Sequence, residues 1–246
     1  MLVLFAAMPV EAGDLIDQLS AEPPLPGSFP RFSGRLAGRP VELVLTGPGK
    51  ANAAAAAASC LASQRPDAIL QFGCGGAYPQ AALNIGDLAL ATCEILLDEG
   101  SDSPEGFLDF EDLGLPLVEG PAAPLYNRFD FDSALVDELY DGLRSFAADN
   151  GISCGKGPFV TVSTCTGTDE QAQQRWQDSL AVCENMEGAA LALVAARFGV
   201  PMVELRGISN LAARRQRDEW DIPGACRNVR KALRHLLARW PGETHG

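Results

Sequence analysis

The chain has 246 residues, which is enough for one α/β domain or two small domains. Its hydrophobic residues (47%) and charged residues (21%) occur in the proportions of a packed globular protein, which argues against intrinsic disorder. The formal net charge of −13 disfavours nucleic acids and anionic membranes as partners, because both attract basic surfaces.

The first half of the chain alternates short apolar runs with breaks that are rich in proline and glycine. Residues 20–30 contain four prolines, so we expect a loop there. Residues 31–36 and 41–45 flank an Ala-Gly-Arg-Pro sequence and predict a β-hairpin. The other expected elements are strands at 1–7, 67–72 and 88–96 and helices at 11–19 and 49–63.

The second half opens with an acidic segment, residues 97–124, which holds eight acidic residues and no basic ones. A loop of this length is usually functional or disordered, and we expect a lid or a subunit contact. Thr168 or Asp169 is predicted to be a helix N-cap, and Gly199 to end a helix. The expected elements are helices at 131–149, 168–178, 187–198 and 222–238 and strands at 159–163, 180–183 and 201–208.

Strands that alternate with helices after one early hairpin predict a three-layer α/β sandwich with a central, mixed and twisted sheet. No internal repeat is found, so we expect residues 1–246 to form a single domain. No apolar stretch approaches the ~20 residues of a membrane-spanning helix, and residues 1–10 lack the pattern of a signal peptide.

The inventory of reactive residues narrows the chemistry. Seven scattered cysteines form no Cys-x-x-Cys pair, which favours reduced thiols in the cytoplasm. The two histidines, His235 and His245, both lie near the C-terminus, which argues against a His-rich metal site or a Ser-His-Asp triad. We therefore expect a cytoplasmic protein that uses neither a metal nor a cofactor.

Four predicted strand ends carry polar residues or glycines, at the edge where ligands gather in open α/β sheets. Each has an ordinary structural explanation when it is taken alone. Glu11 and Glu187 could each be an acid in the first turn of a helix, where the helix dipole favours it. Asn210 could be a turn residue, and Met186 could pack in the core. The Gly-Cys-Gly-Gly sequence at 73–76 could form a tight turn.

The combination of these residues points to cleavage of an N-glycosidic bond. The transition state at a glycosidic carbon resembles an oxocarbenium ion. It needs acceptors for the sugar hydroxyls, a positioned water and a donor to the departing base. Glu11 and Glu187 can serve the first two needs. Asn210 can serve the third when the base is a 6-oxopurine, because its NH₂ group can donate to N7 or O6.

Two motifs carry a resemblance to a known superfamily. The sequences Asn-Met-Glu-Gly-Ala-Ala at 185–190 and Arg-Gly-Ile-Ser-Asn at 206–210 resemble those of the nucleoside phosphorylases and nucleosidases. Residues 7–11, 47–50 and 84–88 match the same superfamily in the same order, so the resemblance covers nearly the whole chain. It implies a nucleoside phosphorylase-like fold.

Within that superfamily, the chain resembles the futalosine hydrolases of menaquinone biosynthesis in particular. Asn210 stands where the adenine-cleaving nucleosidases carry an aspartate, and residues 98–100, 161–168 and 217–222 resemble motifs of the futalosine family. The resemblance implies that the chain hydrolyses futalosine, a small nucleoside, to hypoxanthine and dehypoxanthine futalosine. It also implies a homo-oligomer, which we expect to be a homodimer or a homotetramer.

The resemblance further implies a role for each residue of the site. Two residues are expected to be catalytic: Glu11 orients or activates the water, and Asn210 binds and polarises hypoxanthine. Glu187 would hold the ribose hydroxyls, and Met186 would pack against the sugar. The other expected substrate-binding residues are Gly73, Cys74, Gly75, Thr166, Gly167, Thr168 and Asn185.

Departures from neighbouring families sharpen this expectation. Phosphorylases of the superfamily hold phosphate with an arginine where this chain has Gln71, and phosphate without an arginine fork is poorly bound, so we expect water as the nucleophile. An aspartic acid can protonate N7, whereas Asn210 can only stabilise charge, which disfavours adenine release. The side-arm carboxylate of futalosine calls for a cation, and the open candidates are Arg206, Arg214, Arg215 and Arg217.

Three other functions remain open from the sequence. A purine nucleoside phosphorylase would require phosphate for turnover. A nucleosidase for methylthioadenosine or adenosylhomocysteine would release adenine. A ligand-binding protein on the same fold would leave a bound nucleoside unchanged.

Overall fold

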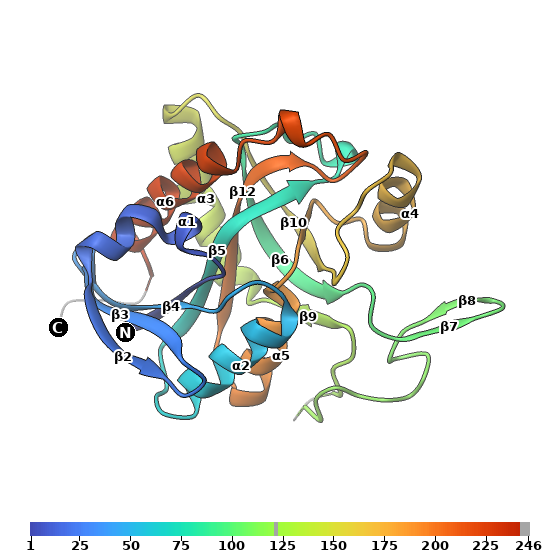
Figure 1. The fold of residues 1–246 in the computed structure, drawn as a ribbon, viewed down its shortest axis with the longest axis horizontal. Coiled ribbons are helices and arrows are strands. Elements are labelled where there is room, and N and C mark those ends of the chain that lie inside the picture. The colour runs from blue at the N-terminus through green and yellow to red at the C-terminus, as the bar shows by residue number, and fades with distance from the viewer. Residues whose placement is uncertain (121–122, 242–246) are drawn as a thin grey trace.

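The computed structural model describes residues 1–120 and 123–241, and its centre is one large twisted sheet (Figure 1). The strand order is β11-β10-β6-β12-β5-β1-β4-β3-β2, and β9 pairs with β6. The central strands β4, β1, β5 and β12 are parallel, whereas β6 runs antiparallel to β12. The strands of this sheet are β1 (Leu2–Ala6), β2 (Ser20–Leu25), β3 (Phe29–Leu36), β4 (Arg39–Leu45), β5 (Ala68–Ala77), β6 (Leu88–Leu96), β9 (Arg128–Asp130), β10 (Cys154–Thr161), β11 (Cys183–Asn185) and β12 (Met202–Leu211).

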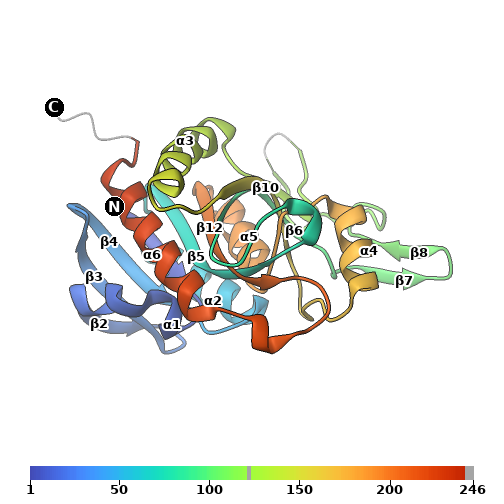
Figure 2. The same ribbon diagram turned by 90° about the horizontal axis from the view of Figure 1, so that it is seen from above.

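Helices cover both faces of the sheet. The α-helices are α1 (Pro9–Ala12), α2 (Lys50–Leu61), α3 (Ser133–Asp149), α4 (Asp169–Ser179), α5 (Gly188–Phe198) and α6 (Ile222–Ala238). α1, α3 and α6 lie on one face, α2 and α5 lie on the other, and α4 stands beside the β10 end (Figures 1 and 2). The predicted three-layer sandwich with a mixed sheet is therefore confirmed. None of the described helices is long and apolar enough to cross a membrane.

Two predictions for the N-terminal quarter are wrong in part. The helix expected at 11–19 begins earlier, at Pro9, because proline is preorganised for the first helical position. It lasts one turn and continues as a 3₁₀ helix, η1 (Gly13–Gln18). The loop expected at 20–30 is largely β2, which pairs with β3 at the outer edge of the sheet. Its prolines are tolerated because an edge strand has one unpaired side, and the pairing shifts register between Glu22 and Leu25.

Strand lengths around the sheet centre also differ from expectation. β5 does not stop at Phe72 before a tight turn, but continues through the glycines to Ala77. β12 likewise continues past Ile208 to Leu211, with a bulge between Ile208 and Asn210. The strand expected at 180–183 starts only at Cys183, because Leu180 adopts a left-handed conformation that ends α4. By contrast, the predicted strand at 88–96 and helix at 222–238 match β6 and α6.

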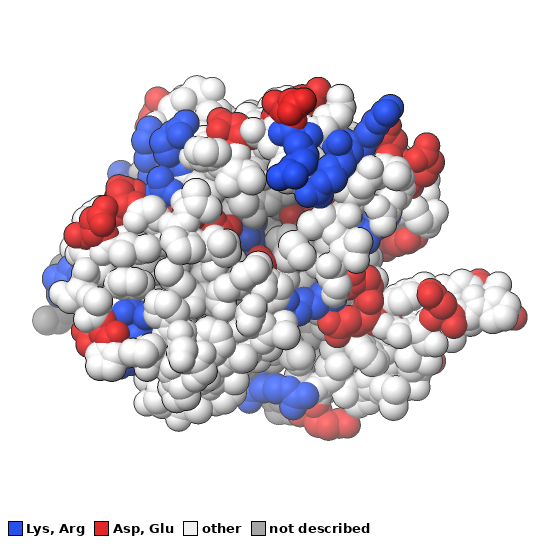
Figure 3. Space-filling view, viewed as in Figure 1, with Lys and Arg blue, Asp and Glu red and all other residues white. Residues whose placement is uncertain are grey.

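Residues 101–108 of the acidic segment project from the body of the protein as a small hairpin, β7 (Ser101–Ser103) with β8 (Gly106–Leu108) (Figure 1). Acidic side chains gather around the base of this hairpin (Figure 3). Apolar side chains on the same segment are also exposed: Phe107 by 46% and Leu115 by 56%. Residues 121–122 of the segment lie outside the described part, and its role as a lid or subunit contact stays a prediction.

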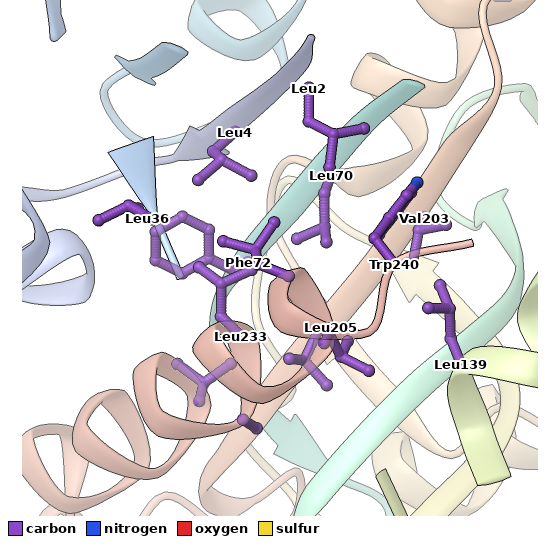
Figure 4. Packing of buried hydrophobic residues seen from close by; sticks show 14 of the residues in the cluster. Leu2, Leu4, Leu36, Leu70, Phe72, Leu139, Val203, Leu205, Leu233 and Trp240 are labelled. Atoms are coloured by element: carbon purple, nitrogen blue, oxygen red, sulfur yellow. The ribbon is translucent and has the colours of Figure 1, made fainter. Parts of the chain in front are cut away.

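Alternating side chains of the central strands build the two cores. Leu2 and Leu4 of β1 join Leu70 and Phe72 of β5 on the α3 and α6 side (Figure 4). The intervening Val3, Phe5 and Ile69 face α2 and α5. This period of two buries both faces of each strand and fixes which residues emerge at the carboxyl end of the sheet.

Candidate active site

Glu11 enters the site from the short helix α1, directly after β1. The residue is 4% exposed, and its Oε2 accepts hydrogen bonds from the N–H groups of Ala7 and Met8, both at 2.9 Å. Oε1 accepts from the N–H of Cys74 at 3.0 Å. Burial raises the pKa of Glu11 above its usual range, while Arg206 and these N–H groups oppose the rise. Glu11 is thus a fixed carboxylate whose affinity for a proton is increased, as a general base requires.

Arg206 lies at the centre of the site and is only 1% exposed. Its Nε donates to Glu204 Oε1 at 2.8 Å. Its Nη1 lies 3.9 Å from Glu11 Oε1, and its Nη2 lies 3.6 Å from Glu187 Oε2. Burial acts to lower the pKa of Arg206, but the three carboxylates raise it overall, so the guanidinium stays charged. One buried cation therefore joins three glutamates, and the cluster is anionic when all three are ionised.

Glu187 stands at the N-terminus of α5. Its Oε1 accepts from the N–H of Gly49 at 2.8 Å, which ties it to the glycine turn before α2. Asn185 Oδ1 accepts from the N–H groups of Glu187 (2.9 Å) and Gly188 (2.7 Å). Asn185 is itself buried, so in this structure its side chain holds the backbone of Glu187. A direct contact between Asn185 and a substrate stays a prediction.

The glycines of β5 let these groups approach one another. A Cβ atom on Gly73 would lie 2.2 Å from Glu11 Oε1 and 2.8 Å from Arg206 Nη1. A Cβ on Gly75 would lie 2.5 Å from Cys183 Sγ. These glycines therefore form part of a strand and not a tight turn. They lie beside Glu11 and Arg206 because a side chain at this point of the strand would collide with both.

Asn210 lies near the end of β12, and residues 166–168 directly precede α4. The bulge in β12 places Asn210 opposite Gly76, and bulges often turn a side chain toward a site. Asn210 is half-buried, its Oδ1 accepts from Ser209 Oγ at 2.8 Å, and its Nδ2 donates to the carbonyl of Leu211 at 3.0 Å. Thr166 is buried, whereas Thr168 is exposed and caps α4 by accepting from the N–H of Gln171, as predicted.

Several polar residues of the site region were missed from the sequence. Glu184 accepts from Thr166 N (2.8 Å), Tyr78 Oη (3.0 Å) and Arg175 Nη1 (2.8 Å), and so anchors the turn that carries Thr166. Glu94 and Glu204 were missed as well, and both are fully buried behind Arg206. A sequence signal for Glu204 does exist: residues two apart on a buried strand share a face, which pairs Glu204 with Arg206.

The remaining predicted residues are placed as follows. The backbone N–H of Cys74 donates to Glu11, and its carbonyl accepts from Arg206 Nη1 at 3.1 Å. Met186 is half-buried and lines a cavity of about 520 Å³ together with Gly49 and Ser163. In residues 1–120 and 123–241, no group of three or more His, Cys, Asp or Glu side chains is arranged to hold a metal ion.

The sequence and the fold both have known relatives. The family model described as the phosphorylase superfamily matches residues 2–239. A futalosine hydrolase of Acidothermus cellulolyticus is 38% identical over 66% of this chain, a match that spans 62% of that enzyme and so less than two thirds of its length. A futalosine hydrolase of Thermus thermophilus is 36% identical, over 80% of this chain and 81% of the enzyme.

A solved structure supports the same fold. The 5′-methylthioadenosine/S-adenosylhomocysteine nucleosidase of Neisseria meningitidis, in complex with methylthio-immucillin-A, superimposes with a TM-score of 0.80. The superposition covers 97% of this chain and 98% of that one, at 23% identity. At this identity, the likeness concerns the fold alone.

Proposed function

This chain belongs to the phosphorylase superfamily, and we propose that it hydrolyses the N-glycosidic bond of futalosine. The products are hypoxanthine and dehypoxanthine futalosine, as a step of menaquinone biosynthesis. The futalosine hydrolases among its relatives support this substrate. The observation that carries the reaction type is the buried cluster in which Glu11, Glu187 and Glu204 face Arg206.

This cluster favours water over phosphate as the nucleophile. A phosphate dianion would have to enter beside three carboxylates whose single cation, Arg206, already contacts all of them. Gln71, at the position where phosphorylases carry an arginine, is buried and neutral. Water carries no charge and meets no such repulsion. The same negative potential stabilises an oxocarbenium-like sugar as positive charge develops on it.

Glu11 is the proposed general base. As the bond between C1′ and the purine nitrogen breaks, its electron pair leaves with the base, and a water held by Glu11 attacks C1′ and gives its proton to the carboxylate. The departed hypoxanthine anion takes a proton from solvent, and Glu11 releases its proton to solvent. The raised pKa of Glu11 strengthens it as a proton acceptor near neutral pH. Three backbone N–H groups fix its two oxygens, so little reorganisation is needed when the water reacts.

Glu187 and Asn210 are proposed to hold the two halves of the substrate. Glu187 keeps acceptor capacity beyond its bond from Gly49 and receives hydrogen bonds from the ribose hydroxyls, while Met186 packs against the sugar. Asn210 Nδ2 donates to N7 or O6 of the departing hypoxanthine. Because an amide cannot transfer a proton, the 6-oxo group must share the charge, which favours hypoxanthine over adenine as the leaving base.

The carboxylate on the side arm of the substrate needs a cation, and Arg215 is the best placed of the four candidates. Arg206 is committed to three carboxylates. Arg214 shares its cavity with Asp169 and Glu219. The Arg215 guanidinium stacks 4.7 Å from the centre of the Trp220 ring, and the backbone N–H of Arg215 donates to the carbonyl of Gly167. Basic side chains gather over this loop, beside a hollow in the surface (Figure 3).

We also propose that residues 1–246 form one domain and that the protein works as a homodimer or homotetramer in the cytoplasm. The exposed Phe107, Leu113 and Leu115 of the acidic segment support a subunit contact there. The seven cysteines are all free, which is compatible with a reducing compartment. Sedimentation of the purified protein tests the oligomer, and a monomer at micromolar concentration contradicts it.

The function is tested by incubating the purified protein with futalosine in phosphate-free buffer. We expect stoichiometric release of hypoxanthine, and no release of adenine in parallel reactions with methylthioadenosine or adenosylhomocysteine. Release that requires phosphate identifies a phosphorylase. Preferential adenine release identifies the other nucleosidase. If no nucleoside is cleaved, the proposal is wrong.

A further inference from the structure

Behind the proposed site, Glu94 of β6 and Glu204 of β12 bring two carboxyl groups together, and both side chains are 0% exposed. A Cβ atom on Gly188 would lie 2.2 Å from Glu94 Oε1 and 2.3 Å from Glu204 Oε2, so these two oxygens converge on one point. Glu204 Oε2 is buried and has no donor among the described residues. Two ionised carboxylates would repel each other strongly here, so one of them must carry a proton.

The neighbours of each group decide which one carries it. Glu204 Oε1 accepts a charged hydrogen bond from Arg206 Nε at 2.8 Å, which favours the carboxylate form. Within residues 1–120 and 123–241, the donors to Glu94 are neutral: Thr161 Oγ1 at 2.8 Å and Asn185 Nδ2. A proton on Glu94 Oε1 points to Glu204 Oε2 and gives that oxygen its missing donor. Burial and the nearby Glu204 both raise the pKa of Glu94 well above its usual range.

We propose that Glu94 remains protonated and donates to the Glu204 carboxylate, and that this pair is a positioning device for Arg206 and Glu187. One arm runs through Glu204, which holds Arg206 Nε and leaves Nη1 and Nη2 to face Glu11 and Glu187. The other arm runs through Asn185. Its Nδ2 donates to Glu94 while its Oδ1 fixes the backbone of Glu187.

The charge balance depends on this proton. In the described part of the chain, the titratable groups that act on the pair or on Arg206 include Glu187, Glu11 and the thiol of Cys183. With Glu94 neutral, three carboxylates face one guanidinium. A fourth ionised carboxylate would compete for Arg206 and weaken its hold on Glu11 and Glu187. The protonation state can be tested without any substrate. The positioning role rests on the proposed function, because its test measures turnover of futalosine.

Infrared spectroscopy tests the proton directly. At pH near 8, the wild-type protein should show the absorption of a buried neutral carboxylic acid, and Glu94→Gln should lack it. Glu11→Gln is the matched control, because it removes another buried site carboxyl whose pKa is raised and should leave the Glu94 band in place. If Glu94→Gln leaves the spectrum of the wild type unchanged, Glu94 is not the protonated partner.

Thermal unfolding gives a second test that needs no activity. A pKa that is raised in the folded state means that the folded protein prefers the neutral form of Glu94. This preference favours folding fully below the ordinary carboxyl pKa and is lost as pH rises. Glutamine cannot ionise, so the Tm of Glu94→Gln relative to wild type should increase between about pH 5 and pH 8. Parallel Tm curves would contradict the inference.

Kinetics test the positioning role. Glu94→Gln keeps an N–H donor for Glu204 and should hold kcat on futalosine within about threefold, whereas Glu94→Leu should lower kcat roughly tenfold or more by displacing Arg206. KM should rise as well in Glu94→Leu, because Asn185, which fixes the backbone of Glu187, loses its contact with Glu94. Equal effects of the two substitutions on kcat would overturn the positioning role.

If Glu94→Leu does not fold, Glu204→Gln serves instead. The substitution removes one of the carboxylates that Arg206 contacts, so it should move the acidic limb of the kcat/KM profile to lower pH. An unmoved limb would overturn the role.

Discussion

The two sides of the site differ in how firmly the protein holds them. On the proposed water and sugar side, Glu11, Glu187 and Arg206 are at most 5% exposed and are fixed by hydrogen bonds from distant parts of the chain. On the proposed base side, Asn210 is half-buried, and its side-chain hydrogen bonds within the described residues go to its neighbours Ser209 and Leu211. Under the proposed function, bond cleavage is therefore assigned to a rigid centre, and the choice of base to a few side chains with fewer constraints.

The largest effect is expected from Glu11→Gln, which keeps the shape of the rigid side and removes its base. We expect kcat on futalosine to fall about 10³-fold, in the range typical of a lost general base. Steady-state release of hypoxanthine measures this loss. A variant with more than about a tenth of the wild-type kcat would show that Glu11 does not accept the proton of the water.

The pH dependence of kcat/KM is the control for Glu11→Gln. Because burial raises the pKa of Glu11, the acidic limb of kcat/KM should lie above the ordinary glutamate range, with activity lost as pH falls through it. Glu11→Gln should abolish this limb in the residual activity. The same raised pKa costs folding stability as pH rises, so Glu11→Gln should gain Tm over wild type toward alkaline pH. An unchanged limb in Glu11→Gln would assign the titration to another group.

The next largest effect is expected on the base side. Asn210→Ala should lower kcat on futalosine roughly 10²-fold, because a donor to the departing base is lost. Asn210→Asp supplies a carboxylic acid that can protonate N7, so it should raise adenine release from methylthioadenosine relative to hypoxanthine release from futalosine. Full activity of Asn210→Ala on futalosine would mean that the base site lies elsewhere.

Substitution of two glycines of β5 tests whether the two sides of the site differ in rigidity. A methyl on Gly73 collides with Glu11 and Arg206, whereas one on Gly76 would lie 3.0 Å from Asn210 Nδ2 and 3.3 Å from Ala212 Cβ. Gly73→Ala should therefore lower kcat about tenfold and destabilise the fold by about 1–3 kcal/mol. Gly76→Ala should cost clearly less of both. Steady-state kinetics and thermal unfolding of the two variants measure these losses. Equal losses of kcat and stability in the two variants would contradict a difference in rigidity between the two sides.

The smallest effect is expected from Arg215→Ala at the outer rim. An exposed ion pair contributes up to about 1 kcal/mol, so KM for futalosine should rise about fivefold with little change in kcat. Arg214→Ala and Arg217→Ala are matched controls that should leave KM nearly unchanged. The neutral carboxamide analogue of futalosine should show no difference between wild type and Arg215→Ala. Equal effects of all three substitutions on KM would show that Arg215 is not the specific partner of the side-arm carboxylate.

The sequence alone was most informative where function depends on local position. Glu11 and Glu187 follow predicted strands, and the sheet does bring them to one cation. The pairing of Glu94 with Glu204 could not be predicted, because it depends on β6 and β12 being neighbours in the sheet. The length of β5 was misjudged because its glycines favour turns locally, whereas here they admit Glu11 and Arg206. Tertiary contacts overrode the local preference at that strand, as they did for the prolines of β2.

The central claim is that Glu11 delivers water, and not phosphate, to the sugar. A single turnover of futalosine in isotopically labelled water with saturating phosphate present tests it most directly. We predict that the label appears on C1′ of dehypoxanthine futalosine and that no sugar 1-phosphate forms. A phosphorylated sugar product, or an unlabelled one, would contradict the account.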